Sequence, residues 1–397
     1  MPPMPRIAAA LCLAALVATG CGKGAETPEV KPVKFPTVGT GGEQKEAVAE
    51  LGFPVFATKN TTRVGGADPV ADAAAAARAV FPAVSPETRP AAVTLVDAAD
   101  WQTALAASVL MSDPIRAPIL LTEGTELPSA TEAALDALAP TGSEPAGGAQ
   151  VIRVGDVARP AGLKSTDLVG ADPATLARAI DAFHASARGA SSDSVVVVSS
   201  EKPEFAMPAA AWAAKSGDPI LFADRDTLPE ATKAAIAAHQ QPHIYVLGPS
   251  SVISPKVTIQ LRKLGTVTRV GGQDPATNAI EFAKYVDTTF GWGVVDPGHG
   301  LVFADPRRPA DAAAASPLSA SGTWGPLLLL GDDGELPKSV EDYLLDIQPG
   351  YREDPTRGVY NHGWIIGDDK AVSIGAQARI DTLLEIAPAK NSLPSQP

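Results

Sequence analysis

The sequence has few cysteines, few histidines, few aromatic residues and an excess of acidic over basic side chains. Its 397 residues include 2 cysteines and 5 histidines, which excludes a disulfide framework and a cysteine-rich zinc site. Aromatic residues make up 5% of the chain, which argues against a stacking surface for bases or sugars. The formal net charge of −13 argues against the basic surface that nucleic acids or anionic lipids require. What remains is an acidic, alanine-rich protein that is too long for one ordinary domain.

Motifs of catalysis and cofactor binding are also missing. The sequence contains no Gly-x-x-x-x-Gly-Lys loop, no Gly-x-Gly-x-x-Gly after a strand and no Gly-x-Ser-x-Gly elbow. His239 and His243 have the spacing of metal ligands on a helix, but a proline between them breaks such a helix. His299 and His362 are predicted to be loop residues with surface roles. The acidic run 332–335 lacks the spaced oxygens of a calcium loop and is predicted to be a solvated turn. We therefore predict no enzyme activity, no cofactor and no metal site.

The first residues are predicted to be a targeting signal. An apolar run, Ile7–Val17, is too short to span a membrane and is followed by Ala18-Thr19-Gly20-Cys21. The segment resembles a bacterial lipoprotein signal, in which Cys21 would carry a diacylglyceryl membrane anchor after cleavage of residues 1–20. The alternative is a secreted protein with a cysteine at an ordinary cleavage site. Residues 21–50 are predicted to form a flexible tether, and 388–397 a disordered tail, because both are polar and lack a hydrophobic period.

The rest of the chain repeats three times. Thr62-Arg63-Val64-Gly65-Gly66 recurs letter for letter as Thr268-Arg269-Val270-Gly271-Gly272, and an Asp-Pro pair follows each copy after one residue. A looser copy, 166–173, lies between them, so that the aspartates Asp68, Asp172 and Asp274 recur roughly every hundred residues. Three further motifs recur in the same order: a Pro-Ile-Leu-Leu-like strand, a Leu-Pro turn and an apolar strand that ends in glycine. The predicted units are repeat 1 (51–162), repeat 2 (163–264) and repeat 3 (265–387).

Each repeat has the pattern of an α/β unit. A short strand leads into Asp-Pro, where the aspartate caps a helix and the proline takes the first helical position. Continuous apolar strands such as Val195–Ser199 then alternate with alanine-rich helices such as Trp101–Met111. Such strands are covered on both faces, and the alternation with helices predicts parallel pairing with right-handed crossovers. The predicted fold is therefore α/β, with three tandem small three-layer units.

These repeats resemble the cell wall binding repeat 2 family. Its members carry an Arg-x-x-Gly-x-Asp-Arg-x-x-Thr-Ala opening, a Pro-Asp-Ala-Leu helix start, a Pro-Ile-Leu-Leu strand and a Leu-Pro turn. The resemblance covers about 53–386 and implies three pseudo-symmetric units in a triangular arrangement and non-catalytic attachment to wall polymers. The opening is altered here, because Asp167 replaces the arginine of repeat 2 and proline follows each motif aspartate. Candidate ligand-binding residues are the remaining motif residues, Arg63, Asp68, Asp172, Arg269 and Asp274. For the aspartates, helix capping is the preferred interpretation.

The preferred functional hypothesis is a non-catalytic lipoprotein that binds or scaffolds at the interface of wall and membrane. It would lie on the extracellular face of the cytoplasmic membrane of a Gram-positive bacterium, anchored through Cys21, with wall polymer as a possible partner and no nucleic acid. One alternative is a lipid-anchored solute-binding receptor of an importer, although such receptors have two lobes rather than three equal units. Another is a hydrolase, which is disfavoured because the repeats leave no room for an additional catalytic domain.

Overall fold

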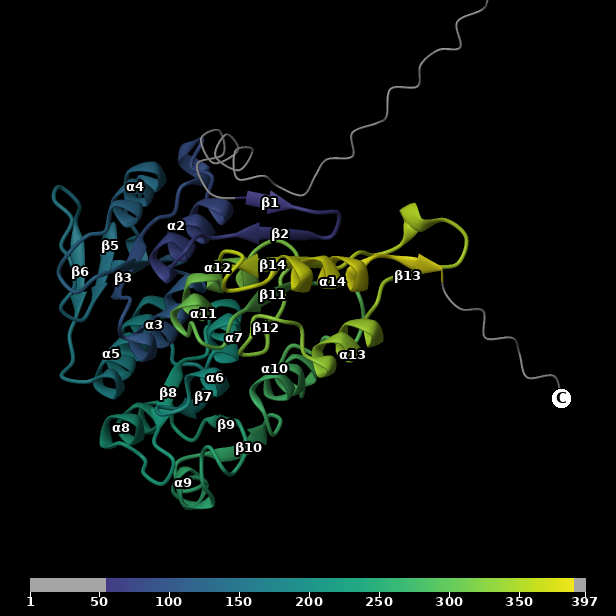
Figure 1. Ribbon diagram of the computed structural model, residues 1–397. Coiled ribbons are helices and arrows are strands. Elements are labelled where there is room, and N and C mark those ends of the chain that lie inside the picture. Colours follow the sequence, from purple (N-terminus) through teal and green to yellow (C-terminus); the bar gives the residue numbers. More distant parts are fainter. Residues whose placement is uncertain (1–54, 389–397) are drawn as a thin grey trace, which may run out of the picture. The chain divides into compact units, whose positions relative to one another are not determined.

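The computed structural model describes residues 55–388, and the predicted signal, Cys21, the predicted tether and all of the predicted tail except Pro388 lie outside this range. Three parallel sheets form the described part (Figure 1). The first has the order β4 (Ile119–Thr122), β3 (Val93–Asp97), β5 (Val151–Val154), β6 (Ser165–Leu168). The second has the order β8 (Ile220–Ala223), β7 (Ser194–Ser199), β9 (His243–Leu247), β10 (Thr266–Val270). The third has the order β12 (Leu327–Leu329), β11 (Gly300–Ala304), β14 (His362–Ile366), β2 (Thr61–Val64), β1 (Val55–Ala57).

The sheets combine strands of neighbouring repeats. The strand that opens repeat 2, β6, pairs with β5 of repeat 1, and the strand that opens repeat 3, β10, pairs with β9 of repeat 2. The strand that opens repeat 1, β2, pairs in parallel with β14 near the other end of the chain, where Arg63 faces Ile365 in register. Beyond it, β1 adds an antiparallel edge strand. The chain is thus closed, in the sense that β2 of repeat 1 pairs with β14 of repeat 3 in the third sheet.

The helix after each opening strand crosses to the next sheet. Helix α2 (Pro69–Val80) follows β2 of the third sheet and packs on β4 of the first, beside α4 (Ser129–Leu138). The two corresponding pairs are α5 (Pro173–Arg188) with α8 (Glu230–Ala238) and α10 (Pro275–Lys284) with α13 (Lys338–Asp346). Each Gly-x-Asp-Pro segment, or its counterpart, therefore lies where the chain leaves one sheet for another. We call these three places the junctions.

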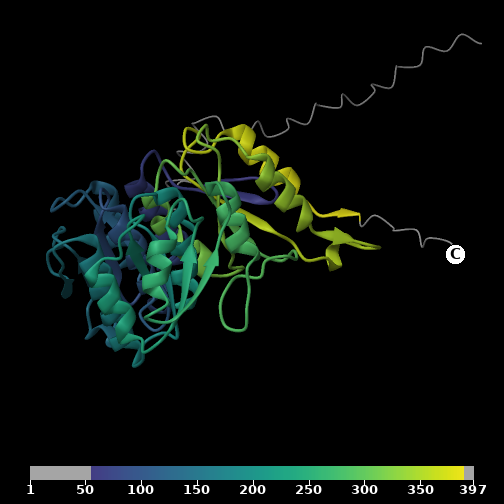
Figure 2. The same ribbon diagram turned by 90° about the horizontal axis from the view of Figure 1, so that it is seen from below.

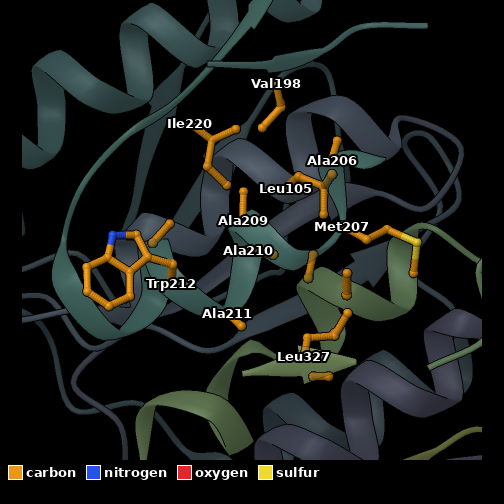
Figure 3. Close-up of a cluster of buried hydrophobic side chains, with 14 of the residues drawn as sticks. Leu105, Val198, Ala206, Met207, Ala209, Ala210, Ala211, Trp212, Ile220 and Leu327 are labelled. Carbon is orange, nitrogen blue, oxygen red and sulfur yellow. The ribbon is translucent and has the colours of Figure 1, made fainter. Parts of the chain in front are cut away.

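Helices that follow the central strands cover the other faces and meet one another. They are α3 (Trp101–Ala107), α6 (Pro203–Ala206), α7 (Pro208–Ser216), α11 (Ala310–Ala314) and α12 (Ser316–Ala320). Helices α3, α7 and α11 contact each other pairwise, which gives the three units their predicted pseudo-three-fold relation. Figure 3 shows this seam, in which the small side chains Ala209, Ala210 and Ala211 of α7 lie between Leu105 of α3 and Leu327 of β12. Alanine allows the helix backbones to approach closely while still removing apolar surface from water.

The predicted α/β class with three parallel-sheet units is confirmed, and local differences have identifiable causes. The helix predicted at 101–111 stays α-helical only to Ala107 and continues as a 3₁₀ turn, Ser108–Met111. Its counterpart in repeat 3 is divided into α11 and α12, where Pro317 lacks the N–H that a continuous helix requires.

Repeat 3 also has a small β13 (Gly350–Tyr351) and β15 (Ala387–Pro388) pair, seen to project in Figure 2. The remaining helices are α9 (Pro255–Leu261) and α14 (Ile374–Leu384). Among residues 55–388, no helix is long and apolar enough to cross a membrane.

Candidate functional site

The three motif aspartates cap the helices that leave the junctions. A side-chain oxygen of Asp68 accepts from the backbone N–H of Ala71 at 2.9 Å. Asp172 accepts from the N–H of Thr175 at 2.8 Å, and Asp274 from the N–H of Thr277 at 2.9 Å. Each aspartate precedes a proline at the start of its helix, as the sequence predicted. Capping of this kind stabilises a helix by about 1 kcal/mol, so the preferred interpretation of these residues is confirmed.

A glycine is required where the chain turns into two of the junctions. Gly65 has a φ of +137°, and a Cβ at this position would lie 2.2 Å from Oδ1 of Asp72. Gly271 has a φ of +136°, and a Cβ there would lie 2.1 Å from Oδ1 of Asn278. The repeated glycines of the motif therefore make room for the polar side chain in the first turn of the following helix.

Arg63 is buried and its guanidinium is directed into the protein. Its side chain is 6% exposed and donates to the carbonyl oxygens of Gly367, Asp368 and Val372 and to Oε1 of Gln377, at 2.7–2.9 Å. Burial lowers the pKa of Arg63 to about 10, although the nearby Asp368 and Asp369 oppose this. The arginine thus ties the opening strand of repeat 1 to the loop after β14, which is part of the closure of the chain.

Arg269 has the corresponding position on β10 but a more open environment. Its guanidinium donates to the carbonyl oxygens of Gly248 at 2.6 Å and Ile253 at 2.7 Å, and the residue is half-buried. Burial lowers its pKa, and so does the positive charge of Arg262. The two motif arginines therefore share the role of holding the loop after the neighbouring strand, while only Arg269 keeps contact with solvent.

The junction of the first sheet has exchanged its charges between two strands. Asp167 of β6 occupies the place of the arginine, and its register partner on β5 is Arg153. Arg153 donates to Asp167 at 2.8 Å, to the carbonyl oxygen of Ala158 at 2.9 Å and to that of Val157. Arg159 also pairs with Asp167. The loop after β5 is therefore held by an arginine of β5 itself instead of one from the opening strand β6, a substitution that the repeated motif does not reveal.

A buried acidic pair lies at the junction of the third sheet and was also missed. Asp72 of α2 and Asp311 of α11 are both fully buried, and Arg308 lies between them. Arg308 donates to Asp72, its Nε lies 2.8 Å from Oδ2 of Asp311, and Asp72 accepts from the N–H of Gly66 at 2.5 Å. Burial raises the pKa of Asp72 to about 7, and burial together with the charge of Asp72 raises that of Asp311. Two carboxyls that share one arginine favour retention of a proton at neutral pH.

The five candidate ligand residues thus belong to three separate junctions rather than one site. Arg63 and Asp68 lie where the third sheet leads into α2, Asp172 where the first sheet leads into α5, and Arg269 and Asp274 where the second leads into α10. Their role toward a ligand stays a prediction. A groove of about 600 Å³ lies elsewhere, beside α4, and is lined among others by Arg89, Leu135 and Leu163.

Comparison with known proteins identifies the family. The model of the family "Cell wall binding domain 2 (CWB2)" matches residues 168–258 and 269–377, together about half of the chain. The chain belongs to the CWB2 family. It therefore carries cell wall binding domains in tandem, which associate it with the cell envelope. The matched CWB2 residues begin at Leu168, so all of repeat 1 lies outside them, although its sheet has the same strand order as the other two.

Two solved structures and one curated protein are similar to this chain. Cwp6 from Clostridium difficile has a TM-score of 0.64 at 19% identity, over 82% of this chain and 48% of that one. Cwp8 from the same organism has a TM-score of 0.62 at 19% identity, over 86% of this chain and 54% of that one. These similarities support the CWB2 fold. The amidase enhancer of Bacillus subtilis (strain 168) is 30% identical over 151 residues, 37% of this chain and 20% of that protein. The chain thus matches about a fifth of this curated relative.

The histidines do not form a metal site in the described CWB2 units. His239 is buried, with Nε2 at 2.8 Å from Oδ2 of Asp181 and Nδ1 at 2.7 Å from the carbonyl oxygen of Ser192, whereas His243 is exposed at the start of β9. His299 precedes β11, but His362 begins β14 and is half-buried beside Trp364, so its prediction as a loop residue was wrong. The strand continues through His362 because it pairs with Gly300 of β11.

Proposed function

We propose that this chain is a non-catalytic envelope protein, built of three CWB2-type units, that binds a polymer of the cell wall. The observation that carries the proposal is the closure of the third sheet by β2, because it joins all three units into one set of equivalent junctions. Membership of the CWB2 family supports wall polymer as the ligand class. A non-catalytic role is supported by the polar groups at the junctions, since Arg63, Arg153 and the motif aspartates are engaged in structural hydrogen bonds.

Co-sedimentation with purified wall tests this function. Residues 22–397, which include every described residue, are mixed with peptidoglycan sacculi that retain their secondary polymers and with sacculi from which these polymers have been removed. We expect the protein to sediment with the first and to remain in solution with the second. Binding to neither, at low and at high salt, would contradict the proposal. Turbidity of the sacculi, followed in parallel, is expected to stay constant, whereas clearing would contradict a non-catalytic role.

We further propose that Cys21 carries a lipid that anchors the protein to the outer face of the cytoplasmic membrane. The support is the apolar run Ile7–Val17 and the small residues directly before Cys21. A Cys21→Ala variant is expected to leave the membrane fraction and to appear in the medium or with the wall. Retention of this variant by membranes after the wall has been digested would contradict lipid anchoring. The wall-binding proposal does not depend on this result.

A further inference from the structure

The three junctions differ in how completely their arginine is satisfied. A guanidinium carries five N–H donors. Within the described residues, Arg63 makes four hydrogen bonds and Arg153 makes three, one of them to the carboxylate of Asp167. Arg269 makes two, both to backbone carbonyl oxygens. Arg269 is also the one of the three that stays half-exposed, so its remaining donors can be reached from solvent.

The three arginines also differ in their acidic neighbours, and Arg269 is again the least compensated. Asp368, Asp369 and Asp72 act on Arg63, and Asp167 forms an ion pair with Arg153. Arg269 has no acidic side chain within 4.0 Å among residues 55–388, and the charged group that acts on it is Arg262, an exposed residue at the end of α9. Two cations without an intervening carboxylate repel each other, and an anion that binds both would relieve this repulsion.

The loop held by Arg269 brings further positive charge to this junction. Arg269 binds the carbonyl oxygens of Gly248 and Ile253, and Arg225 donates to the carbonyl oxygen of Ser251 between them at 3.1 Å. The carboxylate of Asp226 is shared by Arg225, at 3.1 Å, and Lys256, at 3.7 Å, and Oε1 of Glu201 accepts from the backbone N–H of Arg225 at 3.5 Å.

We propose that the junction of the second sheet, centred on Arg269 and Arg262, is the position at which this chain binds the anionic groups of a wall polymer, and that the other two junctions do not. The inference rests on the proposed wall-binding function and assigns it to one of three equivalent places. The ligand groups are phosphates or carboxylates, since both accept hydrogen bonds from a guanidinium fork. The overall acidity of the protein then opposes non-specific adhesion to the same polymer, which confines binding to this surface.

Four variants test the assignment, and each replaces one arginine by glutamine and so removes one positive charge. Arg262→Gln is the main variant, because its exposed side chain makes no hydrogen bond or ion pair with another described residue. Arg269→Gln is the second. The matched controls are Arg159→Gln at the first junction and Arg307→Gln at the third, which remove exposed arginines paired with Asp167 and Asp305. Soluble polyphosphate and soluble polygalacturonate serve as phosphate and carboxylate probes, and binding to polymer-bearing sacculi is measured beside them. Thermal unfolding confirms that each variant is folded.

We expect Arg262→Gln to weaken binding to sacculi and to one of the two probes by about ten-fold, while the controls change it less than two-fold. The probe that responds identifies the anion as phosphate or carboxylate. Equal weakening by all four variants would overturn the inference, because it would indicate a general charge effect. Unchanged binding of Arg262→Gln to sacculi would also overturn it while leaving the wall-binding function intact. If the unmodified protein binds neither sacculi nor probes, the proposed function itself fails.

Discussion

Arg153 on β5 and Asp167 on β6 stand side by side in register, and their side chains form an ion pair of 2.8 Å. In the other two sheets the strand of β6 is represented by β2 and β10, which carry Arg63 and Arg269. In the first sheet the arginine therefore lies on β5, the strand next to β6, and Asp167 occupies the position on β6 that corresponds to Arg63 and Arg269. The arginine that the motif lacks in repeat 2 is still present at the junction, but it is neutralised there.

Replacement of Asp167 by Asn is expected to lower stability by no more than about 1 kcal/mol, because the ion pair is partly exposed. Burial alone would raise the pKa of Asp167, but hydrogen bonds from Arg153 and Arg159 lower it more. A lowered folded-state pKa stabilises the protein above pH 4, and this contribution is lost as the pH falls below that value. Urea unfolding at pH 2–7 should therefore show that the natural chain is more stable than Asp167→Asn near pH 7 and equally stable near pH 2. The same loss in the exposed control Asp156→Asn would contradict the assignment.

The buried pair Asp72 and Asp311 predicts the opposite pH dependence. The pKa of Asp72 is raised to about 7 on folding and that of Asp311 is also raised, so the contribution of the pair to stability is greatest below about pH 4 and is lost as the pH rises through their folded-state pKa values. Asp311→Asn leaves Arg308 with one buried carboxylate, Asp72, beside the more distant Asp368, and removes the repulsion within the buried pair. We expect this variant to be more stable than the natural chain by about 1–2 kcal/mol at pH 8 and equally stable at pH 4. Chemical unfolding at the two pH values measures this.

The exposed cap Asp68 provides a control for the acidic pair, because it belongs to the same junction. Asp68→Asn should retain the cap and keep the stability of the natural chain at pH 8 to within about 0.5 kcal/mol. If Asp311→Asn is less stable than the natural chain at pH 8, the two carboxyls are not in competition for Arg308.

Two buried histidines are expected to respond to pH in opposite ways. Burial lowers the pKa of His184, whose Nε2 lies 2.9 Å from Oγ of Ser112, so its contribution to stability is lost as the pH falls below about 6.5. Burial would also lower the pKa of His239, but its hydrogen bond to Asp181 raises it, so its contribution is lost as the pH rises. Thermal unfolding from pH 5 to 8 should show a flatter acidic limb for His184→Asn. A slope equal to that of the natural chain would refute the role of His184.

The alanine seam predicts that size, not polarity, limits substitution there. Ala210 of α7 is fully buried between helices of the other two units, so Ala210→Leu is expected to destabilise the fold by about 1–3 kcal/mol through overpacking. The matched control, Ala237→Leu, lies on the exposed face of α8 and should change the free energy of unfolding by less than about 0.5 kcal/mol. Equal effects of the two substitutions on the free energy of unfolding would contradict tight packing of the seam.

Much of the fold could be predicted from local sequence, and the partners of the strands could not. Helices α2, α5 and α10 begin at the prolines that follow the predicted aspartate caps, and β7 includes the predicted strand Val195–Ser199, since caps and continuous apolar runs act locally. The pairing of β2 with β14 joins residues about three hundred positions apart, and no local pattern encodes such a choice.

The candidate residues show the same division between local and long-range information. The capping role of Asp68 follows from its immediate neighbours, whereas the burial of Arg63 and the shift of Arg153 depend on which strand lies alongside. The contact of Arg308 with Asp72 likewise joins residues 236 positions apart.

The measurement that tests the central proposal most directly is the affinity of residues 22–397 for soluble polymer released from the wall, determined by titration calorimetry at two salt concentrations. The account predicts saturable binding with defined stoichiometry that weakens as salt rises, because a cationic junction must bind an anionic group. Absence of heat and of saturation at both salt concentrations, with a folded protein, would contradict wall-polymer binding by this chain.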